Sequence, residues 1–340
     1  MVFLDFSSLF IQVAFGLKKR ELMYSKNHLR TAFLSRLFAL LKRFRRYGKL
    51  QILADSGKYW RAEIFAGYKK KRAVRRLQDD VDWDALHAAQ DSIAAEMREN
   101  LPYALISVDG MEADDLIALS CRFHAPKNKR HLIISSDKDL TQLLREPNFS
   151  QWSVGKRSFL EYDPDAFKAH ILRGDSSDSV PSIYFDDDRL IKSNGRRRLT
   201  DAKLKEVDIS SVEKFRESYK NDPELERITA NYRRNRALID LRNIPYRFLP
   251  LFRKAAKEAQ RNAKAAEANA ETYLAKNNLL RKFQAIGERK EPNRPNGSKP
   301  RQTDQNCAKR RKEDFGDRKR RSFAPRRDLP PAQSDTKSES

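Results

Sequence analysis

Nine acidic residues that could bind metal ions occur in five separate segments of the chain, in a protein whose other charges are mostly positive. They are Asp5, Asp55, Glu112, Asp114, Asp115, Asp137, Asp139, Asp175 and Asp178. Carboxylates gathered in one place repel each other unless cations neutralise them, and oxygen ligands favour Mg²⁺ or Mn²⁺ over Zn²⁺. Two such ions, about 4 Å apart, can hold a phosphodiester, activate a water and stabilise the leaving oxygen. The set predicts phosphodiester hydrolysis with two Mg²⁺ ions, for which Mn²⁺ could substitute.

Short apolar segments of strand length precede four of the five acidic groups. Their residues are 2–4, 50–54, 104–108 and 131–135. Helical patterns alternate with them, at 7–17, 83–100 and 113–123. This alternation is typical of a parallel sheet with crossover helices, in which ligands bind outside the carboxyl ends of the strands. We therefore expect an α/β fold in which four acidic groups converge, joined by Asp175 and Asp178, which would share one face if their segment is helical.

Further elements are expected on both sides of the acidic segments. Apolar residues from Phe33 to Phe44 have the spacing of a buried helical stripe. The other patterns predict a helix at 138–145, a hairpin at 151–162, a helix at 164–173 with a proline near its start, and a long Ala- and Lys-rich helical segment at 255–285.

Each acidic group also has an ordinary structural interpretation. Asp114 and Asp115 open a predicted helix and could complement its dipole. Asp137 could be an N-cap, and Asp175 with Asp178 could belong to a solvated turn. For any single one of these residues, such a structural role is more common than metal binding. Five groups in matching positions, in a chain of opposite net charge, favour a metal site.

A basic segment, residues 58–76, follows Asp55 and interleaves aromatic residues with cations. Lys69 and Arg72 are three residues apart and would line one helical face, where Lys69 could contact a substrate phosphate and Arg61 could supply a second contact. The remaining candidates for nucleic-acid binding in this segment are Tyr59, Trp60, Tyr68, Lys70, Lys71 and Arg72. Aromatic residues there could stack on a terminal base. The alternative is a general electrostatic patch.

The charge of the whole chain indicates a polyanionic partner. Lys and Arg number 70 against 47 Asp and Glu in 340 residues, a net charge of +23. Such a surplus predicts attraction to nucleic acid that weakens with salt. A membrane surface is the competing partner, but Asp5 interrupts the apolar start and the basic cluster at 18–20 follows it, unlike a signal peptide. We expect a soluble cytoplasmic protein, in the host cytoplasm or nucleoid if its source is viral, with no membrane partner.

The two cysteines and the polar C-terminal residues indicate the redox compartment and the order of the chain. Cys121 and Cys307 form neither a disulfide framework nor a zinc pattern, which indicates a reducing compartment. Residues 289–340 contain 16 Lys and Arg against 8 acids and almost no apolar residues. We expect this basic tail to be disordered.

Three motifs resemble, in order and spacing, those of the flap endonuclease and 5′→3′ exonuclease superfamily. They are EADD at 112–115, SDKD at 136–139 and GDSSDSVP at 174–181. The stretches YWR at 59–61, YKK at 68–70, 133–143 and QWS at 151–153 are similar to the ribonucleases H of T-even bacteriophages in particular. The resemblance covers 2–181 and extends thinly to 245.

The resemblance implies a PIN-like nuclease domain at 1–162, with a helical arch at about 56–100, and a helix-three-turn-helix region at 163–288 that binds duplex. It implies 5′→3′ removal of RNA primers from RNA/DNA duplex in replication, and cleavage of DNA with 5′ ends, flaps or nicks. A monomer is expected, with a single-strand-binding protein or a sliding clamp as conceivable partners. One metal would be bound by Asp5, Asp55, Glu112, Asp114 and Asp137, and the second by Asp139, Asp175 and Asp178, some through water. Asp115 is assigned to neither ion.

The chain departs from the superfamily pattern after Val180, where YFDDD at 184–188 replaces a glycine-rich hairpin, so no monovalent-cation site is implied there. Two other functions compete with the nuclease. A non-catalytic nucleic-acid-binding protein would have lost a metal ligand, yet every acidic position is filled. A PIN-type ribonuclease acting on RNA shares the acids but lacks the basic segment and the 174–181 motif.

Overall fold

The computed structural model describes residues 1–18, 22–123, 125–126, 128–185 and 198–287. Its centre is a six-stranded sheet in the order β3-β2-β1-β4-β5-β6. The strands are β1 Val2–Asp5, β2 Leu50–Leu53, β3 Ala104–Ile106, β4 His131–Ile134, β5 Phe149–Ser153 and β6 Ser158–Leu160. The first five are parallel, and β6 pairs antiparallel with β5. The expected parallel sheet and terminal hairpin are confirmed.

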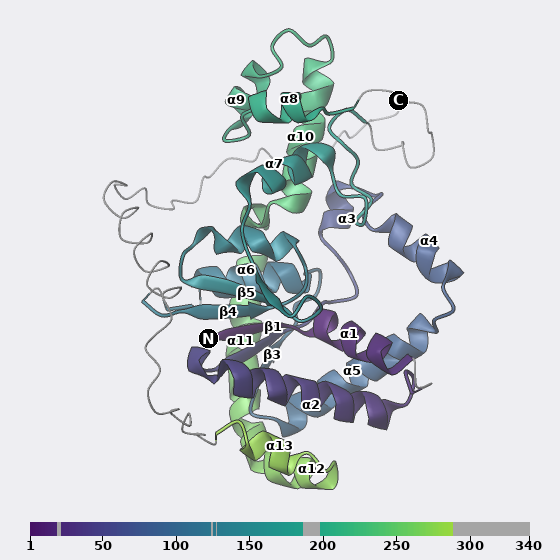
Figure 1. Cartoon of the computed structure of the whole chain (residues 1–340), viewed down its shortest axis with the longest axis vertical. Helices are drawn as coiled ribbons and strands as arrows, with labels where there is room; N and C mark the ends of the chain where they lie inside the picture. The colour runs from purple at the N-terminus through teal and green to yellow at the C-terminus, as the bar shows by residue number, and fades with distance from the viewer. Residues whose placement is uncertain (19–21, 124, 127, 186–197, 288–340) are drawn as a thin grey trace, which may run out of the picture. The chain divides into compact units, whose positions relative to one another are not determined.

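Both faces of the sheet are covered, which is why its strands read as continuous apolar runs. Along β1, Val2 and Leu4 pack on one face with α1 Phe6–Lys18, α2 Lys26–Phe44 and α5 Trp83–Asn100. Phe3 points to the other face, against α6 Ala113–Phe123 and α11 Phe248–Ala266. This alternation is the period of two of a strand. Figure 1 shows α2 and α5 beside the sheet and α11 running behind it.

The basic segment connects β2 to α5 and forms two short helices. These are α3 Arg61–Ile64 and α4 Lys70–Gln78. No residue of α4 is buried, and Figure 1 shows this helix standing away from the sheet. Lys69 precedes α4 with a left-handed φ of 57°, so it does not lie on one helical face with Arg72 as the spacing predicted.

A helical region with its own core follows the sheet. It comprises α7 Pro164–Arg173, α8 Asp201–Glu206, α9 Val212–Glu217 and α10 Leu225–Ile239. The helix expected at 138–145 is the 3₁₀ helix η2 Asp139–Arg145, which lies between β4 and β5 and packs against the sheet. Phe215 and Tyr232 stack at its centre, with ring centroids 4.0 Å apart. The side chain of Asp163 caps α7, as expected for a helix with proline in its first turn.

The last described elements differ from the single helical segment expected at 255–285. The 3₁₀ helix η4 Leu241–Asn243 leads into α11, which begins at Phe248 and is followed by η5 Glu267–Asn269, α12 Ala270–Lys276 and α13 Leu280–Gln284. Asn278 takes a left-handed φ of 58°, and the amide of Leu279 bonds to the carbonyl of Leu274. This ends α12 and buries both leucines against α2 and α5. A further 3₁₀ turn, η1 Arg45–Tyr47, precedes β2.

Several sequence-based expectations fall outside the described residues: part of the 18–20 basic cluster, the acids at 186–188 and the tail at 289–340. Within the described ranges, no helix is both long and apolar enough to cross a membrane.

Candidate metal and nuclease site

The acids that follow β1 to β4 are linked by hydrogen bonds at the carboxyl edge of the sheet. Asp5, the last residue of β1, accepts a bond of 2.7 Å from the hydroxyl of Ser135, which follows β4. Asp55 accepts a bond of 2.9 Å from the amide of Ala113, at the start of α6. Asp137 accepts from the amide of Asp139. The four strand-end groups therefore meet at one edge, because parallel strands end together there.

Burial and repulsion between neighbouring carboxylates raise the pKa of several acids in this cluster. Burial, together with the charges of Asp55 and Asp137, raises the pKa of Asp5 to about 7. Burial and the neighbouring Asp137 likewise raise the pKa of Asp139 to about 7. The pKa of Asp114 lies well above its ordinary value because of burial and four acidic neighbours. Such carboxylates lack enough positive charge nearby, which is the condition that a bound cation relieves.

Glu112 belongs to the cluster but is held by cations of the basic segment. Lys69 forms an ion pair with Glu112, and the hydroxyl of Tyr68 donates to Glu112 at 2.9 Å and to Asp178 at 3.0 Å. Arg72 lies 2.5 Å from Asp178. Burial alone would raise the pKa of Glu112, but Arg61 and Lys69 outweigh it and lower that pKa. Tyr68, Lys69 and Arg72 of the basic segment therefore lie against the acidic cluster.

Three residues differ from their expected roles because they are buried together. Arg61, expected to contact phosphate, is 3% exposed, and Trp60, expected to contact nucleic acid, is 2% exposed. Asp115, expected among the metal ligands, is completely buried. It accepts two bonds from Arg61 and one from the indole of Trp60. The contacts of Asp115 and Trp60 are therefore inside the protein, where they form a buried anchor with Arg61, and Arg61 also lines the pocket that the acids surround.

Asp175 and Asp178 lie in a turn, which corrects the expectation of a shared helical face. Asp175 forms an isolated β-bridge with Val180. One of its oxygens, Oδ1, accepts from the amide of Ser177 at 2.7 Å, from the hydroxyl of Ser177 at 2.5 Å and from the amide of Asp178 at 3.3 Å. The carbonyl of Asp178 accepts from the amide of Lys69, which fixes this turn against the basic segment.

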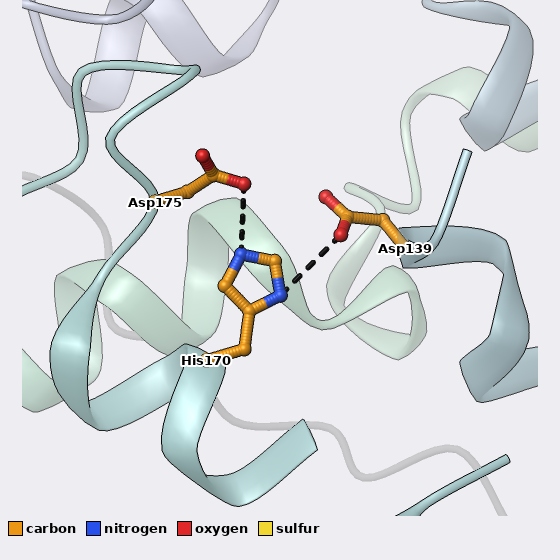
Figure 2. A group of neighbouring side chains, drawn as sticks. All are labelled: Asp139, His170 and Asp175. Atoms are coloured by element: carbon orange, nitrogen blue, oxygen red, sulfur yellow. Dashed lines mark hydrogen bonds and ion pairs between the residues drawn. The ribbon is translucent and has the colours of Figure 1, made fainter. Parts of the chain in front are cut away.

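His170 is a site residue that the sequence reasoning missed. It lies in the last turn of α7, with Nε2 2.8 Å from Asp175 Oδ2 and Nδ1 3.3 Å from Asp139 Oδ1 (Figure 2). Burial would lower its pKa, but the hydrogen bond that His170 donates to Asp175 and the charge of Asp139 raise it. The feature of the sequence that could have indicated His170 is its position, one helical turn before the 174–181 motif.

Acids that follow the strands and acids of the turn at 174–181 line one small pocket together. Its wall includes Tyr68, Asp114, Asp139, Asp175 and Asp178. Of the other residues expected to bind nucleic acid, Lys70 and Lys71 are exposed on α4 and Tyr59 is half-buried. The ring of Tyr59 meets that of Tyr68 edge-on, and Lys69 lies 4.8 Å from the centroid of Tyr59.

A mostly parallel sheet with clustered acids at its carboxyl edge defines a resolvase-like domain of the nuclease type. Residues 1–171 match the family described as 5′-3′ exonuclease, N-terminal resolvase-like domain. The chain belongs to this family. The expected α/β PIN-like fold and membership of the 5′-nuclease superfamily are therefore confirmed.

Individual relatives agree with this assignment. Ribonuclease H of Enterobacteria phage T4 is 32% identical over 143 residues, which cover 40% of this chain and 47% of that protein. A 5′-3′ exonuclease of Aquifex aeolicus (strain VF5) is 29% identical over 160 residues, 44% of this chain and 53% of that protein. The chain thus spans about half the length of these curated relatives.

Solved structures show the same fold. A phage T5 5′-exonuclease with bound zinc aligns with a TM-score of 0.56 at 16% identity, covering 77% of this chain and 99% of that one. The phage T5 flap endonuclease in complex with DNA and metal ions aligns with a TM-score of 0.53 at 18% identity, covering 77% of this chain and 98% of that one.

Proposed function

We propose that this protein is a 5′→3′ nuclease that hydrolyses phosphodiesters with divalent cations. Its proposed substrates are RNA in RNA/DNA duplex and DNA with 5′ ends, nicks or flaps. The observation that carries the proposal is the gathering of acids from separate segments at one edge of the sheet, beside cations of the basic segment. This gathering and burial raise the pKa of Asp5, Asp114 and Asp139. The ribonuclease H name of the phage T4 relative supports the hybrid substrate.

The residues present fit divalent cations. Asp139 Oδ1 is buried and accepts no hydrogen bond within the described part of the chain. We assign one ion to Asp5, Asp55, Glu112, Asp114 and Asp137, and a second to the group of Asp139, Asp175 and Asp178. Bound Mg²⁺ or Mn²⁺ would supply a Lewis acid and a water of lowered pKa. Ligands that are all oxygen in the first group favour Mg²⁺ there.

The basic segment supplies the proposed contacts to substrate. Lys69 and Arg72 already lie against Glu112 and Asp178, so their charges reach the place where a scissile phosphate would bind. Lys70 and Lys71 extend the same positive charge along exposed α4. Positively charged donors in such positions hold phosphate oxygens and offset the charge that develops during displacement. Tyr59 is the aromatic residue that we assign to a terminal base.

The division of the chain follows the same proposal. Residues 1–162 would form the nuclease domain, and 163–288 would bind duplex beyond the cut. The helical region has its own hydrophobic core, to which residues of α7, α8, α9 and α10 contribute. This separate core supports a function of its own for the region. A monomeric state, a cytoplasmic location and binding of a single-strand-binding protein or clamp remain predictions.

The proposal is tested with a 5′-labelled RNA strand annealed to DNA, incubated with Mg²⁺ or with chelator. We expect short 5′ products in Mg²⁺, none in chelator and a loss of at least 100-fold in rate for Asp114→Asn, because one ligand and its charge are removed. Asp109→Asn makes the same change at an exposed acid just before α6 and should act as wild type.

Equal product in Mg²⁺, chelator and Asp114→Asn would contradict metal-dependent hydrolysis. Absence of product from the wild type on hybrid, nicked and flap substrates alike would favour a binding protein that retained the fold. Comparing initial rates on those three substrates assigns the preference between RNA and DNA.

A further inference from the structure

Asp139, His170 and Asp175 bring donor atoms from three elements to one point. One ligand atom from each lies within 4.8 Å of the others. Figure 2 shows the imidazole of His170 between the two carboxylates, with one ring nitrogen directed at each. Two members of the group lie on regular elements, since Asp139 is the first residue of η2 and His170 lies in the last turn of α7.

The hydrogen bonds of Asp175 determine which nitrogen of His170 carries a proton. Its Oδ1 already accepts from Ser177 and from the amide of Asp178. Its Oδ2 lies 2.8 Å from His170 Nε2, and a carboxylate can only accept, so Nε2 is the donor. In the neutral ring the lone pair then belongs to Nδ1.

This lone pair faces a carboxylate oxygen that has no hydrogen bond. Nδ1 lies 3.3 Å from Asp139 Oδ1. That oxygen is buried and is without a hydrogen-bond partner among the residues that the structure describes. Two bonds of about 2.1 Å to one ion separate their donor atoms by about 3.0 Å at an octahedral angle and about 3.4 Å at a tetrahedral angle. The observed separation falls between these values.

We infer that His170 is a nitrogen ligand of the second divalent-cation site, bound through Nδ1 beside Asp139. Asp175, assigned above to the group around this ion, then belongs to the site by orienting the ring of His170 and not as a direct ligand. The inference rests on the proposed metal-dependent function. A histidine that donates its other nitrogen to a carboxylate while it ligates a metal is a common arrangement, and the carboxylate fixes the ring's tautomer and direction.

A nitrogen ligand changes which ions this site favours. Imidazole suits transition-metal ions such as Zn²⁺ and Fe²⁺, among which Mn²⁺ binds most weakly, whereas Mg²⁺ prefers oxygen ligands. The second site should therefore bind Mn²⁺ more tightly than Mg²⁺, while the first site keeps ligands that are all oxygen.

The test is electron-spin-echo spectroscopy of the full chain with Mn²⁺, combined with calorimetric titration by Mn²⁺ and Mg²⁺. We expect nitrogen modulation from bound Mn²⁺ in the wild type and its loss in His170→Gln, with Mn²⁺ affinity lowered about 10- to 100-fold and a smaller change for Mg²⁺. His87→Gln changes a histidine of α5 outside the cluster and should keep the modulation. Asp175→Asn keeps an acceptor for Nε2, so it should keep the modulation at weaker affinity.

Wild-type Mn²⁺ without nitrogen modulation, in a protein that still cleaves substrate with Mn²⁺, would overturn the inference and leave the proposed function standing. Equal Mn²⁺ affinity in His170→Gln and wild type would do the same. Failure of any divalent ion to bind would overturn both. Because the wild-type spectrum is decisive alone, a variant that fails to fold does not remove the test.

Discussion

The guanidinium of Arg61 binds both carboxylate oxygens of Asp115, through bonds of 2.9 and 2.7 Å, in a part of the core closed to solvent. The same side chain donates to the carbonyl of Leu238 in α10 and to Glu112. One buried cation therefore ties the basic segment to the start of α6 and to the helical region.

This anchor predicts a loss of stability for Asp115→Asn. Removing one charge leaves Arg61 buried with a weaker partner, which should lower the free energy of unfolding by about 3 kcal/mol. Urea denaturation followed by circular dichroism measures it. Glu63→Gln breaks an exposed ion pair with Arg247 in the same region and should cost less than about 1 kcal/mol. An Asp115→Asn protein of wild-type stability would indicate that Asp115 is not this anchor.

Tyr68→Phe should weaken the site without weakening the fold. The change removes the hydroxyl that donates to both Glu112 and Asp178. By analogy with residues that orient metal ligands, we expect metal affinity to fall about 10- to 100-fold. Mg²⁺ titration of cleavage rate measures this. Tyr59→Phe, at the adjacent ring, is the matched control and should keep wild-type Mg²⁺ dependence. If both variants behave alike, the hydroxyl of Tyr68 has no special role.

Gly174→Ala should disrupt the turn that presents Asp175 and Asp178. Gly174 has a φ of 74°, and a Cβ there would lie 2.3 Å from the carbonyl oxygen of Val180. With a ψ of −173°, Gly174 lies in a backbone region that essentially only glycine adopts, which costs about 1–3 kcal/mol with a side chain, and the backbone contact adds to it. Thermal unfolding and cleavage assays should both show a loss. Gly57→Ala has open space around its Cβ and should be nearly neutral in stability; a neutral Gly174→Ala would show that the turn can shift freely.

Without divalent ions, the protein should lose stability as pH rises from 6.5 to 8. Asp5 and Asp139 have folded pKa values of about 7, above their ordinary value of 3.8, so the folded state holds protons that the unfolded state releases. As pH rises through about 7, each loses its proton and its charged form is repelled by Asp137. The raised pKa of His170 acts in the same direction.

Melting temperatures in chelator at both pH values measure this effect, with Mg²⁺ as the comparison. Bound Mg²⁺ should reverse the trend, because it favours the charged carboxylates. A melting temperature in chelator that rises with pH would contradict the raised pKa values.

The sequence by itself determined the sheet and the strand-end positions of the first four acidic groups. Strands buried on both faces are mostly apolar, so the segments 2–4, 50–54, 104–108 and 131–135 could be predicted as strands. The helices at Trp83–Asn100, Ala113–Phe123 and Pro164–Arg173 have the predicted bounds, because local periodicity and capping set them.

Only the tertiary structure decided what individual side chains contact. Trp60 and Arg61 are buried because partners 54 to 177 residues away in sequence close over them. His170 joins the site because α7 carries it between Asp139 and Asp175, and no local pattern distinguishes such a histidine from a surface one. The spacing of apolar and polar residues along the chain predicts local conformation and the positions at which strands end. Burial and ligand geometry depend on how distant segments pack. Here that packing buries Asp115 against Arg61, outside the pocket wall, while Arg61 itself lines the pocket together with the acids.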